Sequence, residues 1–140
     1  MKTNSNRSVG ESLALALAIG AAGLSGSAAA APGDDSLATY QRQGGGPFSA
    51  AAGERAFTVK HQTEGESRSC TTCHGTDLTK PGKHAKTGKP IDPLAVSVNP
   101  KGLADPAKVE KWLGRNCRWT LGRDCSPQEK GDFVTYFQSR

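Results

Sequence analysis

The chain has 140 residues, with 18 Lys and Arg against 13 Asp and Glu and a formal net charge of +5. This length suits one domain and excludes a multidomain enzyme. Hydrophobic residues make up only 35% of the chain and aromatic residues 6%, while glycine (17) and proline (8) are frequent. Such a composition forms many loops and a small core, so we expect a group other than protein to fill its centre.

The first thirty residues have the pattern of a secretory signal peptide. Lys2 and Arg7 give a positive start, residues 12–24 form an apolar run, and the alanines at 28–30 fit a cleavage site. The apolar run is shorter than the roughly 20 residues that a membrane-spanning helix needs. We therefore predict that residues 1–30 are removed and that the mature protein is periplasmic, where cysteines can be oxidised.

Residues 31–48 are predicted to form an N-terminal segment with a Gly-rich linker, and residues 49–140 to form the single domain. The linker has three consecutive glycines before Pro47, a composition that interrupts helices and strands. Ser49 can cap a helix that runs to about His61. The domain is therefore expected to begin with a helix.

Cys70, Cys73 and His74 form the motif Cys-Thr-Thr-Cys-His, the attachment signature of a c-type haem. Two cysteines three residues apart lie on one turn of helix, where each sulfur can add to one vinyl group of the haem. The adjacent histidine is then held under the iron as its proximal ligand. We predict one covalently attached haem c as the group that fills the centre.

Three other kinds of site share parts of this motif. A thioredoxin-like redox pair would lie near a βαβ pattern, and the chain has no alternating β-rich runs. A zinc site would need Cys117 and Cys125, whose separation of eight residues exceeds the usual spacing of paired ligands. A disulfide between Cys70 and Cys73 would leave His74 without a role.

The remaining elements follow the motif in chain order. Residues 77–100 are rich in proline and glycine, and their apolar side chains are expected to pack on the haem. Asp105, followed by proline, begins a helix that runs to about Arg115, and Asn116 by itself suits the end of that helix. Ser126 begins the last helix with a capping box. These elements predict an all-α fold of three or more short helices with long loops around one haem.

The second axial ligand of the iron cannot be methionine, because the one methionine, Met1, lies in the predicted signal peptide. This excludes the His/Met pair of ordinary electron-transfer cytochromes c. The remaining candidates are His61, His84, a lysine, Asn116 and an open position. His61 lies at a predicted helix end and His84 among four lysines, so each also fits a solvated histidine.

Three blocks of the sequence resemble the oxygen-binding monohaem cytochromes c called sphaeroides haem protein. These blocks are Cys70-Thr-Thr-Cys-His-Gly75, Trp112-Leu-Gly-Arg-Asn-Cys117 and Gly122-Arg-Asp-Cys125-Ser-Pro-Gln-Glu-Lys130. The resemblance covers about residues 51–138, and the two later blocks together are more specific than the haem motif. It implies a fold related to class I cytochrome c around one covalent haem.

The same resemblance implies roles for particular residues. Asn116 matches the asparagine that binds ferric iron in that family, and Cys117 and Cys125 match cysteines that form a disulfide there. Reduction releases the family's asparagine, and the ferrous iron then binds oxygen, nitric oxide or carbon monoxide. An amide oxygen is a hard, weak donor that suits ferric iron better than ferrous iron, so ligand chemistry agrees with the implied release.

The expected partners are redox proteins. The resemblance implies a dihaem cytochrome c and a membrane cytochrome b. Lys80, Lys83, Lys86 and Lys89 form a basic run that fits either a solvated loop or steering towards an acidic redox partner. Nucleic acid is not expected, because no aromatic residues alternate with these lysines.

Two functions are consistent with the sequence. The first is a monomeric redox and ligand-binding haem protein that binds diatomic ligands at an iron opened by reduction, and whose iron is open to oxygen or nitric oxide chemistry. The second is a simple electron carrier with two firm axial ligands, His74 and His84. Binding of carbon monoxide to the reduced protein separates them, because only the first leaves a coordination position free.

Overall fold

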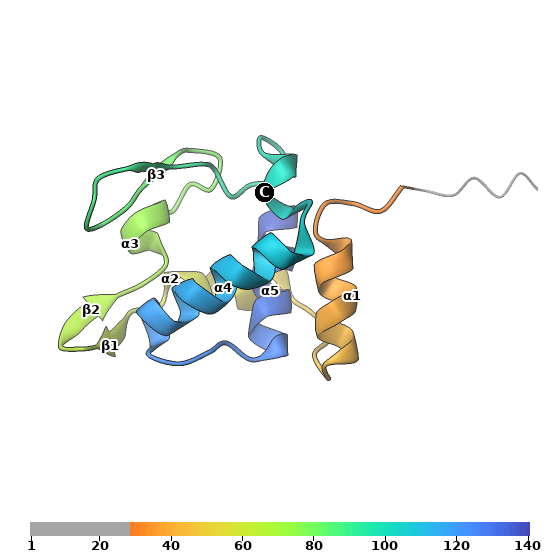
Figure 1. The fold of residues 1–140 in the computed structure, drawn as a ribbon, viewed down its shortest axis with the longest axis horizontal. Coiled ribbons are helices and arrows are strands. Elements are labelled where there is room, and N and C mark those ends of the chain that lie inside the picture. Colours follow the sequence, from red (N-terminus) through yellow and green to blue (C-terminus); the bar gives the residue numbers. More distant parts are fainter. Residues whose placement is uncertain (1–28) are drawn as a thin grey trace, which may run out of the picture.

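The computed structural model describes residues 29–140, so the predicted signal peptide lies outside the described residues except for its last two positions. The helices are α1 (Asp34–Arg42), α2 (Ala50–Thr58), α3 (Thr71–His74), α4 (Pro106–Leu121) and α5 (Pro127–Gln138), with a 3-10 helix η1 (Pro100–Leu103) (Figure 1). Two antiparallel hairpins join β1 (His61–Thr63) to β2 (Glu66–Arg68) and β3 (Gly82–Lys83) to β4 (Pro90–Ile91). Within the described part of the chain, each helix is too short or too polar to cross a membrane.

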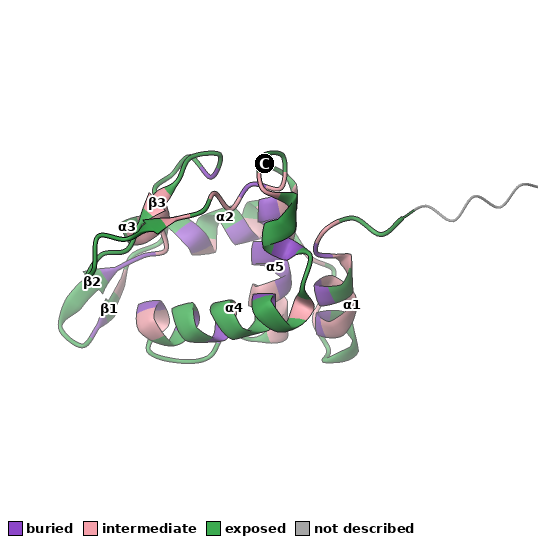
Figure 2. Ribbon diagram, turned by 45° about the horizontal axis from the view of Figure 1, so that its top comes forward, coloured by how far each residue is buried: buried purple, intermediate pink, exposed green. Residues whose placement is uncertain are grey.

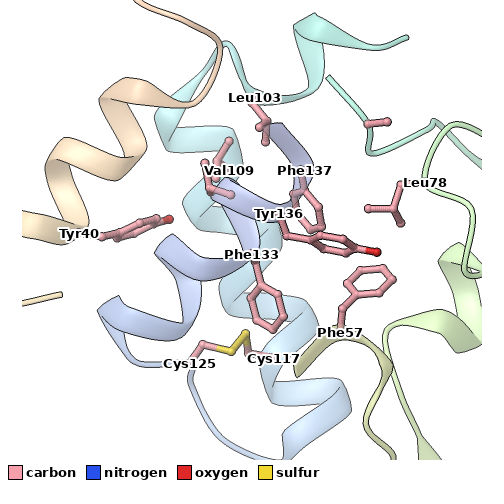
Figure 3. Close-up of a cluster of buried hydrophobic side chains, with 12 residues drawn as sticks. Tyr40, Phe57, Leu78, Leu103, Val109, Cys117, Cys125, Phe133, Tyr136 and Phe137 are labelled. Atoms are coloured by element: carbon pink, nitrogen blue, oxygen red, sulfur yellow. A yellow bond between two sulfur atoms is a disulfide. The ribbon is translucent and has the colours of Figure 1, made fainter. Parts of the chain in front are cut away.

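Helices α2 and α5 cross closely at the centre of the fold. A Cβ atom on the buried Gly53 would clash with the backbone carbonyl of Asp132 in α5. Phe57, one turn further along α2, packs edge-on against Tyr136 and Phe137, with ring centroids 5.7 and 5.9 Å apart (Figure 3). The missing side chain at Gly53 therefore lets this aromatic cluster close.

Three helices begin where the sequence predicts, and each does so through a polar side chain. Ser49 accepts a hydrogen bond from the backbone N–H three residues on, and Asp105 accepts from the N–H groups two and three residues on. Ser126 and Glu129 each accept from the other's backbone N–H, which completes the predicted capping box. Local side-chain bonds therefore satisfy one or two of the free N–H groups in the first turn of each of α2, α4 and α5.

Within residues 31–48, predicted as an N-terminal segment with a Gly-rich linker, residues 34–42 form helix α1. Tyr40 is 2% exposed and donates a hydrogen bond to the Glu110 carboxylate of α4 at 3.1 Å. Lys130 of α5 reaches the same carboxylate at 2.6 Å. The segment has few apolar residues, so its helix depends on tertiary contacts with α4 and α5 that no local pattern reveals.

The predicted C-terminal ends of α2 and α4 are wrong. Helix α2 ends at Thr58 rather than near His61, because residues 61–63 pair with residues 66–68 as a hairpin. Helix α4 continues to Leu121 rather than ending near residue 115, and its C-cap is Gly122, whose φ of 72° is left-handed. Asn116 is therefore interior to the helix and is not its C-cap.

The long stretch of residues 77–100 is held by backbone hydrogen bonds. The N–H groups of Leu94 and Ala95 both donate to the carbonyl of Leu78, at 3.1 and 3.0 Å. The N–H group of Val96 donates to the carbonyl of Phe137 at the end of α5, at 3.1 Å. These bonds and the hairpin of β3 and β4 give the stretch a defined path, where the sequence predicted only a loop.

We predict that Gly53→Ala lowers the free energy of unfolding by about 1–3 kcal/mol, because its methyl group must displace backbone of α5. Gly114 in α4 is the matched control, since a Cβ there meets only ordinary contacts with Arg118. Gly114→Ala should raise stability by about 0.5–1 kcal/mol through its helix propensity. Urea unfolding of the two holoprotein variants measures both changes, and equal effects would contradict the close crossing.

Candidate functional site

A cavity among the described residues has a volume of about 680 Å³. Its walls are the helix α3 region, residues 84–94 and one face of α4, with Phe57, Phe133 and Phe137 among its apolar lining. The predicted site residues on its surface are Cys70, Cys73, His74, His84, Asn116 and Cys117. His61 does not line it, so this candidate ligand is placed outside the site.

Helix α3 presents the two cysteines and the histidine of the predicted attachment motif. The backbone N–H groups of Cys73 and His74 both donate to the carbonyl of Cys70, at 3.3 and 3.1 Å. Gly75, with a φ of 68°, ends this single turn. Both thiols are free and partly buried, so the alternative disulfide between Cys70 and Cys73 is absent from the described structure.

Burial sets the protonation of two groups in this motif. It raises the pKa of the Cys70 thiol to about 11 and lowers the pKa of His74 below its usual value. The lowered pKa favours the neutral imidazole, the form that has a lone pair for a metal. The ring of Phe57, which also lines the cavity, lies with its centroid 6.0 Å from that of His74.

Glycine brings the β3 hairpin against this motif. A Cβ atom on Gly82 would clash with the carbonyl oxygen of Cys73. Three residues further on, the backbone N–H of Ala85 donates to the Cys73 sulfur at 3.4 Å. The basic run therefore passes beside the attachment motif, with Lys86 and Lys89 at the cavity and the other two lysines away from it.

Asn116 lies on the face of α4 that lines the cavity. Val109, Leu113 and Thr120 share this face at spacings of three or four residues, and all four residues are part of the lining. No hydrogen bond of the Asn116 side chain is present within residues 29–140. Its amide oxygen is therefore not committed to another group of the described protein.

The last turns of α4 are fixed by a buried arginine of the β1–β2 hairpin. The Arg68 side chain is 5% exposed and pairs with Glu64 and Glu66 at 3.0 and 2.8 Å. It also donates to the carbonyl of Trp119 at 3.0 Å, and its guanidinium carbon is 4.8 Å from the centroid of that indole. No sequence pattern points to this residue, because 51 positions separate it from its partner in α4.

Two more bonds hold the same part of α4. The Thr63 hydroxyl donates to the carbonyl of Thr120 at 2.7 Å in a buried position. On another side, Cys117 and Cys125 form a disulfide with a Cα–Cα distance of 5.6 Å (Figure 3). This is the pairing that the resemblance implied, and it leaves neither cysteine available for the alternative zinc site.

The hydrogen bonds of His84 do not suit an iron ligand. Its Nδ1 accepts from the backbone N–H groups of Lys86 and Thr87, at 3.3 and 3.2 Å. An accepting Nδ1 needs its lone pair, so the proton of the neutral ring is on Nε2. In a histidine that binds a metal, one ring nitrogen offers its lone pair to the metal and the second ring nitrogen donates its N–H to an acceptor. Nδ1 of His84 accepts instead of donating, so Nε2 has no lone pair to offer.

The cavity has the donors and the size that a haem c requires. Cys70 and Cys73 would supply the two thioether sulfurs, His74 would supply a neutral imidazole, and Asn116 would supply an amide oxygen from the opposing helix. The volume falls in the range of about 300–1,000 Å³ that is typical of cofactor sites. The fold and this site define a helical c-type cytochrome, related to class I cytochrome c, with one covalently attached haem.

Comparison with known proteins gives the family. The chain matches, over residues 43–137, the family described as "Domain of unknown function (DUF1924)". Cytochrome c-type protein SHP from Cereibacter sphaeroides is 46% identical over 106 residues, which cover 74% of this chain and 81% of that protein. The chain therefore belongs to the family of sphaeroides haem protein, as its three sequence blocks predicted.

Solved structures agree with this assignment. The structure of oxidized SHP, described as an oxygen binding cytochrome c, matches with a TM-score of 0.72 and 40% identity, and the match covers 79% of this chain and 98% of that chain. Oxidized cytochrome c'' from Methylophilus methylotrophus matches with a TM-score of 0.69 and 33% identity, covering 78% and 94%. In sequence, cytochrome c'' is 41% identical over 85 residues, or 60% of this chain and 59% of that protein.

We predict that the double change Cys70→Ser and Cys73→Ser removes covalent attachment, because a hydroxyl does not replace the thiol that adds to a vinyl group. Haem should then be extracted fully by acid-acetone, whereas the wild-type haem stays with the protein. Cys73→Ser alone should keep at most one thioether and lower the yield of holoprotein. Haem in the double variant that resists extraction would show that the attachment residues are wrongly assigned.

Proposed function

We propose that this cytochrome binds diatomic ligands, namely oxygen, nitric oxide or carbon monoxide, at a ferrous haem after the loss of Asn116 as a distal ligand. It acts in the periplasm and receives electrons from partner cytochromes, a dihaem cytochrome c and a membrane cytochrome b. The names of the related structures support this proposal. The structure of oxidized SHP is described as that of an oxygen binding cytochrome c, and a solution structure of cytochrome c'' from Methylophilus methylotrophus is described as giving insights into haem-ligand detachment.

One observation carries the proposal: an uncommitted amide lies on the cavity face of α4, in the same cavity as the attachment motif. Asn116 lines the same cavity as His74 and has no hydrogen-bond partner among the described residues. Methionine, the usual distal ligand, is absent from residues 29–140. Asn116 is therefore the cavity residue best suited to a weak second axial bond.

The chain's own residues would determine how this bond opens. The haem supplies an iron that alternates between the ferric and ferrous states and has one position that an outside ligand can take. His74 would keep its neutral imidazole on the proximal side in both states. Asn116 would offer a hard oxygen that suits the ferric state better, so reduction weakens its hold.

Movement of Asn116 would be confined to its side chain. Its neighbour Cys117 is held by the disulfide, and the carbonyls of Trp119 and Thr120 are held by the β1–β2 hairpin. A shift of the whole helix end would break these bonds, whereas rotation about the side-chain bonds of Asn116 breaks none of them. The distal position can therefore open without unfolding any part of α4.

The simple electron carrier with His74 and His84 as ligands is less well supported, because Nδ1 of His84 already accepts two backbone hydrogen bonds. Titration of the reduced protein with carbon monoxide tests the two functions directly. We expect complete binding, with the Soret band moved to the position of a carbonyl complex. A reduced spectrum that stays unchanged at saturating carbon monoxide would refute the proposed function.

We predict that Asn116→Ala keeps the covalent haem but lets azide bind the ferric protein at least tenfold more tightly. If the bond from Asn116 to the iron contributes only about 1.4 kcal/mol, it lowers the apparent affinity for azide by about tenfold, and alanine removes that competition. Carbon monoxide binding to the ferrous protein should change much less, since the amide has already left. Azide titration followed by absorbance measures the first effect.

His84→Ala is the control for this prediction, because His84 lines the same cavity and is not the proposed ligand. It should leave the ferric spectrum and the affinity for azide nearly unchanged. A low-spin ferric spectrum that survives Asn116→Ala but is lost in His84→Ala would make His84 the distal ligand. The electron-carrier function would then be the better supported of the two functions.

A further inference from the structure

A small cavity of about 60 Å³, which we call the α1–α4 notch, lies between α1 and the start of α4. Its lining residues follow one face of α1 and one turn of α4: Ser36, Thr39, Tyr40, Gln43, Pro106 and Glu110. None of them lines the haem cavity, so the notch is separate from the haem site. Figure 2 shows α1 beside the start of α4, with the buried residues of α1 in purple.

One wall of the notch contains a buried hydroxyl group without a protein partner. Ser36 is 2% exposed, and its Oγ makes no hydrogen bond to the described residues. In a helix, a serine hydroxyl can donate to a carbonyl three or four residues earlier. The carbonyl of Gly33 already accepts the N–H of Leu37 at 3.0 Å. The carbonyl of Pro32 already accepts Nε2 of Gln138 at 2.9 Å. Because an unpaired buried hydroxyl is costly, we expect a group from outside the protein to complete its bonding.

Two further polar groups of the notch can accept another hydrogen bond. The Tyr40 hydroxyl donates to Oε2 of Glu110 at 3.1 Å, which leaves lone pairs on both oxygens for an additional donor. Burial and the negative charge of Glu110 raise the pKa of Tyr40, so this hydroxyl keeps its proton. The Thr39 hydroxyl contributes less, because it is already engaged as both donor and acceptor. A ligand in the notch would therefore bond to Ser36, Tyr40 and Glu110.

Size and charge indicate which ligand suits the notch. Its volume of about 60 Å³ exceeds the roughly 10–15 Å³ that one water molecule needs and is far below the roughly 300 Å³ of a small organic ligand site. A cation is disfavoured, because the Glu110 carboxylate already pairs with the Lys130 ammonium at 2.6 Å and this pair is neutral as a unit. A water molecule is neutral, and it can donate to two acceptors while it bonds to the Ser36 hydroxyl.

We propose that the α1–α4 notch binds an ordered water molecule, which bridges the Ser36 hydroxyl of α1 to the oxygens of Tyr40 and Glu110. Because Glu110 also pairs with Lys130 of α5, the bridge joins three helices in one hydrogen-bond network. The bound water helps to hold α1, a helix of 9 residues with few apolar side chains, against α4. The inference is independent of the ligand chemistry at the haem.

High-resolution crystal structures of the ferric holoprotein test the site. Ser97→Ala is the control, because Ser97 is exposed and does not line the notch. In the wild type and the control, we expect a water oxygen within about 3.2 Å of Ser36 Oγ and of the Tyr40 or Glu110 oxygen. In Ser36→Ala, the electron density of this water should fall by about twofold or vanish, since the water loses one of its partners.

Three crystallographic results would overturn the proposal. In the first, Ser36 Oγ lies within about 3.2 Å of the Pro32 carbonyl oxygen and the notch holds no water. In the second, the notch holds a peak with about six or more oxygen contacts at about 2.3–2.6 Å, which is the pattern of a calcium ion. In the third, the water is unchanged in Ser36→Ala, so Ser36 does not bind it.

A double-mutant cycle tests the bridge in solution. Ser36→Ala and Tyr40→Phe each remove one hydroxyl, and these two groups share no direct hydrogen bond in the described structure. If water joins them, urea unfolding should show a coupling of about twofold or more in the unfolding equilibrium constant. Ser97→Ala combined with Tyr40→Phe should give additive effects. Additive effects in both cycles would refute the bridge.

Discussion

The bonds between the β1–β2 hairpin and the end of α4 are the constraint on which the site depends. Arg68 and Thr63 hold the carbonyls of Trp119 and Thr120, and the hairpin leads within two residues into Cys70. One short segment therefore connects the wall that would hold the haem covalently to the wall that would supply its distal ligand. The two walls keep their separation because neither can move without breaking buried hydrogen bonds.

The guanidinium of Arg68, which makes these bonds, is a buried charge. Removing the guanidinium of Arg68 from water is costly, and the two carboxylates of Glu64 and Glu66 with the Trp119 carbonyl offset that cost. The disulfide between Cys117 and Cys125 adds a covalent link on another side of the helix. With its backbone fixed in this way, Asn116 is left with the side-chain freedom that a weak, reversible ligand requires.

The small protein core and the large cavity are two results of the same composition. The chain has few aromatic residues, and four of them, Phe57, Phe133, Tyr136 and Phe137, gather where α2 and α5 cross (Figure 3). Several of these aromatic residues also line the cavity, so the haem completes the hydrophobic core as well as the site.

The sequence by itself determined the chemistry that depends on neighbours along the chain. The Cys-Thr-Thr-Cys-His motif predicted the cofactor, Ser49, Asp105 and Ser126 predicted three helix starts, and the absence of a second methionine excluded the usual distal ligand. Tertiary structure decided what depends on distant partners: helix α1, the extension of α4 past Asn116, and the roles of Arg68 and Thr63. Arg68 and Thr63 lie 51 and 57 residues from their hydrogen-bond partners in α4. A local sequence pattern cannot predict such bonds, because the two groups meet only when the chain folds.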